Sequence, residues 1–218
     1  MISILKSLGI KTKVALPGVG ESMQDHQSMS MRYSVNGTLS GKFLYATMPT
    51  ARDVFGDRLA SVAASTRAKL GQWARQTSAL TGGAISALAI EQRYRVQHDL
   101  IFKKNSTVAE LFPTAAGTTL VAQFWTSLPF SWGSVHLGHK DRIEEPVIDP
   151  RTAMFDFDVE MLAAVGKLNQ KAYSTAPLSS VISAYDPALP LGSTDEEWKT
   201  YVRNTGKFRS PVSVSYLG

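Results

Sequence analysis

The chain has 218 residues, of which 44% are hydrophobic and 19% are charged, and its formal net charge is +5. This composition is typical of a globular protein with a buried core, in one large domain or two small ones. The absence of cysteine excludes disulfides, thiolate metal sites and a cysteine nucleophile. The basic residues are scattered and no apolar run reaches the roughly 18 residues of a membrane span, so we expect neither a nucleic-acid nor a membrane partner.

The first segment, residues 1–8, is predicted to be a short helix that stops at Gly9. Its apolar run, MISILKSLG, is interrupted by Lys6 too soon for a signal peptide. We therefore expect no signal peptide and no transmembrane segment in this chain, and the sequence assigns it no compartment.

Residues 16–26 read LPGVGESMQDH and resemble part of a dinucleotide-binding loop. Such a loop needs three glycines and a following helix. Gly18 and Gly20 meet the first two spacings, but Met23 occupies the third position and a strand-like segment follows. The pattern instead predicts a turn at Pro17-Gly18, with Gly20 at a backbone position that excludes a side chain.

Two features follow this loop. Asp25 beside His26 could form an acid/base pair, but neighbouring side chains diverge in an extended segment, which favours a structural role. The run QSMSMRYSV then alternates strictly between apolar and polar residues. This period of two predicts a half-buried antiparallel strand. Its expected inner residues are Met29, Met31, Tyr33 and Val35, and its expected outer residues are Ser28, Ser30, Arg32 and Ser34.

The middle of the chain predicts a helical pair followed by strands. Residues 58–76 have helical spacing, TGGA at 81–84 breaks the chain, and a second helix runs through Leu88, Ile90 and Tyr94. The runs TTLVAQFWTSL and GSVHLGH then predict two strands, which a Pro-Phe-Ser-Trp turn joins. His136 and His139 lie three residues apart in a strand-like run, on opposite faces, which argues against a shared metal.

The last third predicts two more helices. PVIDPR leads into one that Asp156 is expected to cap, with an apolar face of Phe157, Met161, Val165 and Leu168. Helix-terminal charge preference explains the acidic cluster Asp156, Asp158 and Glu160 better than metal binding does. TDEE at 194–197 fits a capping box, and Trp198, Tyr201 and Val202 give the final helix an apolar side. The predicted class is α+β, an antiparallel sheet with helices on one face.

Taken together, these motifs resemble the glucose–methanol–choline (GMC) oxidoreductase family. The specific segments are LGIKTKVALPGVGESMQDH and LPFSWGSVHL followed by PVIDPR, and the resemblance covers essentially the whole chain. It is nearest to the fungal glucose-oxidase-like and versicolorin-synthase-like branch. The resemblance implies three parts: residues 1–25 from a returning segment of an FAD-binding domain, residues 26–205 from the substrate-binding domain, and residues 206–218 heading back toward the FAD domain.

The family chemistry is oxidation of a small-molecule alcohol, in which a histidine removes the hydroxyl proton and a hydride passes to FAD. That histidine belongs to a motif like N-x-H-P-V-G-T, whereas the tail here reads FRSPVSVSYLG. Either Ser210 occupies the place of the histidine, or FRS aligns and the Asn-x-His triplet is deleted. The glycine fingerprint for FAD is also missing from the chain. The resemblance therefore implies a fragment that is inactive alone and does not bind FAD tightly.

The resemblance also assigns four residues of this chain to the substrate pocket of the family, by their positions in matching motifs. Glu110 in AELF resembles the acid that hydrogen-bonds the catalytic histidine, and Phe112 resembles the aromatic wall two residues later. Trp125 resembles the pocket tryptophan, with Phe124 as a rival, and Arg209 resembles the arginine before the histidine motif. Without the resemblance, these residues would be a helix-start glutamate, core aromatics and a surface arginine. One residue departs from the family pattern, because Trp132 stands where arginine is common.

Two alternatives to a redox role remain at this point. Some relatives in the versicolorin branch use the scaffold for a cyclisation, so a non-redox substrate-binding or cyclase function fits the same fold. A non-catalytic remnant would also fit, and it would expose apolar surface where the FAD domain should pack. The sequence names neither the alcohol, the electron acceptor nor an oligomeric state.

Overall fold

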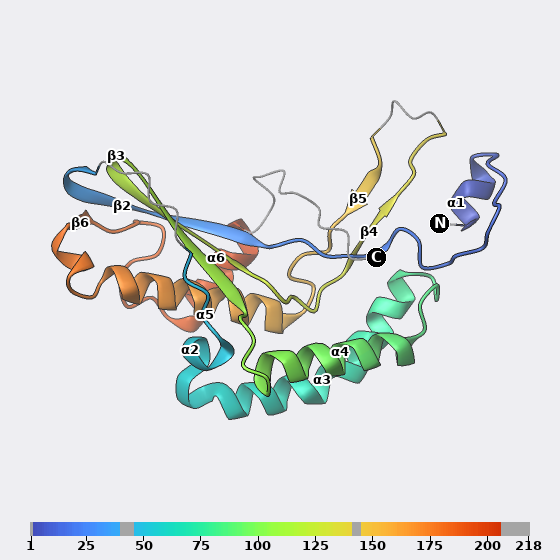
Figure 1. Cartoon of the computed structure of the whole chain (residues 1–218), viewed down its shortest axis with the longest axis horizontal. Helices are drawn as coiled ribbons and strands as arrows, with labels where there is room; N and C mark the ends of the chain where they lie inside the picture. The colour runs from blue at the N-terminus through green and yellow to red at the C-terminus, as the bar shows by residue number, and fades with distance from the viewer. Residues whose placement is uncertain (1, 40–45, 141–144, 206–218) are drawn as a thin grey trace.

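The computed structural model describes residues 2–39, 46–140 and 145–205, which form two antiparallel sheets and a set of helices (Figure 1). The main sheet has the order β3-β2-β6, with β2 at Ser28–Leu39, β3 at Ala109–Thr126 and β6 at Ile182–Ala184. The smaller sheet has the order β1-β4-β5 and consists of Glu21–Met23, Gly133–His136 and Val147–Asp149. The chain therefore has the predicted α+β class, and residues 147–149, expected only as an approach to a helix, form an edge strand.

Strand β3 folds back on itself. Its ends are adjacent, since Ser127 N donates to Val108 O at 2.9 Å, whereas 18 residues of straight strand would span about 60 Å. The reversal lies near Gly117, whose φ of 60° is costly for other residues. The first arm of this hairpin also pairs with Thr47, which exchanges backbone hydrogen bonds with Leu111 at 3.0 and 2.9 Å.

One face of the main sheet is buried and the other is open. The predicted alternation of β2 is confirmed, because its inner residues Met29, Met31, Tyr33 and Val35 are all buried and its outer serines are exposed. Helix α5 (Asp156–Tyr173) contacts β3 from the buried side, and α6 (Asp195–Thr205) packs on α5. Within the described ranges, no helix covers the opposite face (Figure 1).

The other helices are α1 (Ile2–Ser7), α2 (Ala51–Phe55), α3 (Leu59–Leu80) and α4 (Ala87–Phe102), with single 3-10 turns at Gly56–Arg58 and Leu178–Ser180. Helices α3 and α4 form the predicted pair, and the TGGA turn joins them. Gly82 and Gly83 in that turn have φ values of 61° and 77°, which glycine adopts without strain. Ser86 caps α4 by accepting a hydrogen bond from Ala89 N.

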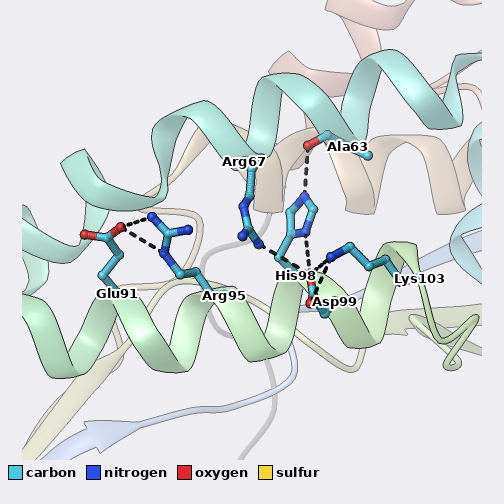
Figure 2. A network of polar contacts seen from close by, with 7 residues as sticks. All are labelled: Ala63, Arg67, Glu91, Arg95, His98, Asp99 and Lys103. Atoms are coloured by element: carbon cyan, nitrogen blue, oxygen red, sulfur yellow. Dashed lines mark hydrogen bonds and ion pairs between the residues drawn. The ribbon is translucent and has the colours of Figure 1, made fainter.

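Polar contacts join the first half of α3 to the last turns of α4 (Figure 2). The buried His98 donates from Nε2 to the carbonyl oxygen of Ala63 at 2.9 Å. The carboxylate of the neighbouring Asp99 accepts hydrogen bonds from Lys103, at the C-terminal end of α4, and from Arg67 of α3. The hydrogen bond from Lys103 holds the pKa of Asp99 below its usual value. These contacts align the helix pair, although exposed ion pairs of this kind contribute little stability.

The capping predictions for α5 and α6 had different outcomes. The TDEE capping box is confirmed, because Thr194 N donates to Glu197 Oε2 at 2.7 Å and Glu197 N donates to Thr194 Oγ1 at 3.3 Å. The prediction that Asp156 caps α5 is wrong. The cap position is Phe155, without a side-chain hydrogen bond, and Asp156 is already the first residue of the helix.

Asp158 also differs from its predicted role as a helix-terminal charge. Its side chain is buried and accepts hydrogen bonds from Phe130 N and Ser131 N, each at 2.8 Å, and from Ser131 Oγ. Burial raises the pKa of this carboxyl to about 6, against the opposing effect of these hydrogen bonds. Asp158 therefore anchors the turn between β3 and β4 to the start of α5.

We predict that Gly166→Ala destabilises the chain by about 1–3 kcal/mol through overpacking. A Cβ at residue 166 would lie 2.2 Å from Cζ3 of Trp198, which is fully buried and has no room to move. Urea unfolding of the purified chain measures the loss. The matched control is Gly71→Ala in α3, where the nearest atom would be at 3.4 Å, and better helix propensity should make this variant as stable as the wild type or more so. Equal behaviour of the two variants would contradict this packing.

We predict that Asp158→Asn lowers stability at neutral pH by about 1–3 kcal/mol, because an amide nitrogen cannot accept the hydrogen bonds from the turn. The control is Asp156→Asn, an exposed neighbour on the same helix turn, which should cost less. Folding raises the pKa of Asp158 from 3.8 to about 6, so the folded state binds the proton more tightly in that window. The contribution of Asp158 to stability should therefore fall as pH rises through it, and unfolding of Asp158→Asn should lack this slope.

Candidate functional site

Three of the four predicted pocket residues share the open face of the main sheet. Glu110 and Phe112 alternate with the buried Ala109 and Leu111, so they point away from the helix layer. Trp125, in the second arm of the β3 hairpin, follows the fully buried Phe124 and points to the same side. The hairpin thus brings together residues that lie 13 to 15 positions apart in the sequence.

The aromatic residues of this group touch one another. The rings of Phe112 and Trp125 are tilted by 36° with centroids 6.3 Å apart, and His26 meets Trp125 edge-on at 6.3 Å. Phe112, Trp125 and His26 are half-buried. Glu110 has no hydrogen-bond or ion-pair partner among the described residues. We call Glu110, Phe112, Trp125 and His26 the open-face site. It offers a carboxylate acceptor beside aromatic walls.

The structure separates the competing interpretations of these residues. Trp125, and not its rival Phe124, lies on the open face, because Phe124 is fully buried in the core. The helix-start interpretation of Glu110 is wrong, since this residue lies in β3. The core interpretation of Phe112 and Trp125 does not fit their half-buried positions. Arg209 and Ser210 lie outside the described residues.

Asp25 and His26 do not form an acid/base pair. The Asp25 carboxylate accepts the backbone N–H of His26 at 2.7 Å, so it contacts the main chain instead of the imidazole ring. This is the structural role that the sequence favoured for Asp25. His26 itself joins the open-face site, which sequence spacing did not indicate. Its position two residues before Ser28 on an alternating strand was the available signal.

The LPGVG loop forms turns and not a phosphate cradle. Val19 N donates to Leu16 O at 3.2 Å and Glu21 N donates to Gly18 O at 3.1 Å, which gives two successive turns. Gly20 has a φ of 86°, as a type II turn requires at its third residue. A strand follows, so this loop lacks the helix N-terminus that would hold a pyrophosphate.

The described residues do not fit a dinucleotide cofactor. All strand pairs between the described strands are antiparallel, whereas the dinucleotide site needs parallel strands and a glycine loop opening a helix. Among these residues, no cluster of three histidine or carboxylate side chains could hold a metal ion. No helix in the described part of the chain is both long and apolar enough to cross a bilayer.

A contact between two side chains joins the end of the LPGVG loop to the small sheet. Glu21 Oε1 lies 2.8 Å from His136 Nε2, and the Glu21 side chain is 3% exposed. Its other oxygen, Oε2, is buried and has no partner in the described structure. This contact joins β1 to β4 beside their backbone pairing. It therefore holds the LPGVG loop against the small sheet.

Trp132, where the family resemblance expects arginine, is a core residue. It is 2% exposed and its ring meets Tyr94 at 4.8 Å. The guanidinium of Arg93 lies 4.1 Å from the centroid of the Trp132 ring, a cation–π distance. A positive group is thus present beside Trp132, supplied from α4.

No family model matches the chain. It is 40% identical over 212 residues to the glucose oxidase-like protein fsoC of Humicola fuscoatra, covering 96% of this chain and 36% of that protein. It is 29% identical over 204 residues to a glucose oxidase of Penicillium chrysogenum, covering 92% of this chain and 33% of the relative. A solved fungal aryl-alcohol oxidase shares the fold at a TM-score of 0.70 and 20% identity, over 92% of this chain and 39% of that one. The chain spans about a third of the length of these curated relatives.

Phe124 faces the core and Trp125 faces the open side, so substitutions at these two adjacent residues should reduce folding stability by different amounts. Phe124→Ala should cost about 3–5 kcal/mol, because it empties a fully buried position. Trp125→Ala should cost only about 1–2 kcal/mol, because Trp125 is half-buried. The substitution removes one edge-on ring contact with His26 and one tilted ring contact with Phe112. Chemical denaturation of both variants checks the order. A larger loss for Trp125→Ala would place Trp125 in the core.

Proposed function

Because this chain belongs to the glucose–methanol–choline oxidoreductase family, we propose that it forms the substrate-binding part of an FAD-dependent enzyme that oxidises the CH–OH group of a small-molecule alcohol. FAD is the cofactor of this family. The observation that carries the proposal is the open face of the main sheet, where Glu110, Phe112 and Trp125 gather opposite the helix layer.

The residues of that face have chemistry suited to an alcohol. Phe112 and Trp125 offer apolar ring surface, which favours burial of the carbon skeleton of a ligand and excludes water around it. Glu110 lies on the same face and has no partner in the described structure, so its carboxylate is free to accept a hydrogen bond from a hydroxyl or from a neighbouring catalytic group. These residues bind and orient the alcohol.

The division into parts follows from the same proposal. Residues 1–25 would belong with an FAD domain, residues 26–205 would form the substrate domain, and residues 206–218 would return toward the FAD domain. In this division β1 crosses between parts, because it pairs with β4 of the proposed substrate domain. The described residues lack a dinucleotide site, so the role of the chain by itself is alcohol binding without turnover.

A chimera tests the proposal. This chain replaces the corresponding segment of the Humicola fuscoatra glucose oxidase-like protein, with which it is 40% identical. We expect the chimera to bind flavin and its flavin to be reduced anaerobically by an alcohol from a mixed panel. Phe112→Ala and Trp125→Ala should each raise KM about tenfold, the loss of roughly 1.4 kcal/mol of ligand contact. The purified 218-residue chain alone should show no stoichiometric flavin absorbance.

The control variant is Val96→Ala, an exposed α4 residue away from the sheet. It should leave KM unchanged. A flavin-loaded chimera whose KM is insensitive to both aromatic substitutions would contradict the proposed site. Alcohol binding that never reduces the bound flavin would contradict the redox role and favour the non-redox alternative. Tight flavin binding by the isolated chain would overturn the division of parts.

A further inference from the structure

His26 adds a nitrogen to the open-face site from the segment before β2. It precedes β2, and its alternation with the buried Gln27 and Met29 turns it to the face that carries Trp125. We propose that His26 is a substrate-binding residue whose Nε2–H donates a hydrogen bond to the hydroxyl oxygen of a neutral alcohol that carries an apolar ring. The inference rests on the proposed function, because it assigns a ligand class to the same face.

The two nitrogens of His26 have different surroundings. Nδ1 is buried and has no hydrogen-bond partner in the described structure. Nε2 is not buried, and it also has no partner there. A neutral imidazole carries one N–H. Nδ1 lacks a partner in either tautomer, so the tautomer is open to selection by a ligand. In the tautomer that the proposal assigns to the ligand-bound site, Nε2–H is the donor on the open face.

Contacts on both sides hold the backbone around His26 in place. The backbone N–H of His26 donates to Asp25, and Gln24 Nε2 donates to Pro129 O at 2.8 Å. Across the sheet, Trp125 is fixed opposite Ser28 in the β2–β3 register. A side chain that served only to pack against Trp125 would be better without nitrogens, because one of them is buried and unpaired. The nitrogen that bears on a binding role is the accessible Nε2, which no described residue contacts, and His26→Phe tests it directly.

The combination of groups specifies the ligand class. A hydroxyl both donates and accepts, so a hydroxyl ligand suits a face that carries both an acceptor, Glu110, and a donor, His26. Phe112 and Trp125 beside them match an apolar ring. A phosphate or carboxylate ligand would be repelled by Glu110, which has no cationic partner among the described residues. Benzyl alcohol is therefore a suitable probe, and toluene is the matched control without the hydroxyl.

NMR titration of the purified chain with both probes tests the inference. His26→Phe keeps the ring against Trp125 and removes both nitrogens. We expect it to weaken benzyl alcohol binding about three- to tenfold, the value of one neutral hydrogen bond, and to leave toluene binding unchanged. His26→Gln, which restores a donor near Nε2, should recover most of the loss. Urea unfolding should show His26→Phe to be as stable as the wild type or more stable, since it removes the unpaired Nδ1.

Each outcome bears on one of the two proposals. Unchanged benzyl alcohol binding in His26→Phe, or an equal loss for toluene, would overturn the role of His26 while leaving the aromatic site intact. Loss in His26→Phe without any effect of Trp125→Ala or Phe112→Ala would support His26 and contradict the proposed aromatic site. A chain that binds neither probe would overturn both.

Discussion

The pairing register between β2 and β3 is the constraint on which the rest of the structure depends. In a strand, successive side chains point to opposite faces, so a register shift of one residue exchanges the core and the open face. The observed register sets Met29 opposite Phe124 and Ser28 opposite Trp125. This places one aromatic ring in the core and its neighbour on the open face, and every assignment to the site follows from it.

The helix layer supports this register from behind. Trp198 of α6 fills the space above Gly166 of α5, and α5 in turn packs on β3. Asp158 at the start of α5 holds the backbone of the turn that leaves β3. A buried carboxylate is expensive to desolvate, and here its hydrogen bonds to the turn offset part of that cost. The position of Trp125 is therefore tied to the helices through the end of its own strand.

The open face has the character of one wall of a binding site. It carries two aromatic rings, a carboxylate without a partner among the described residues and a histidine with one accessible nitrogen. The chain spans about a third of the length of its curated relatives, and its described residues supply no dinucleotide site. Family membership and the composition of the face are the two grounds for our proposal that this face binds an alcohol. The contact of Glu21 with His136 joins the LPGVG loop to the small sheet but takes no part in this face.

The sequence by itself determined the features that depend on local physics. The alternation of β2, the TGGA turn between α3 and α4 and the Thr194–Glu197 capping box each involve contacts within a few residues, and all were predicted correctly. The family was also identified from sequence, because LPGVGESMQDH and the segment through PVIDPR are specific. Glu110, Phe112 and Trp125 were named by that resemblance.

Tertiary structure alone decided which members of similar pairs are buried and which are exposed. Asp156 and Asp158 are the same residue type two positions apart, yet only Asp158 is buried against a turn from 27 residues away. Phe124 and Trp125 are adjacent aromatics, and pairing with β2 determines their faces. His26 reached the site in the same way, through a cross-strand contact with Trp125. Local alternation indicates which residues share a face, but it does not specify their cross-strand partners, because these contacts form only when the β3 hairpin reverses near Gly117 and lies beside β2.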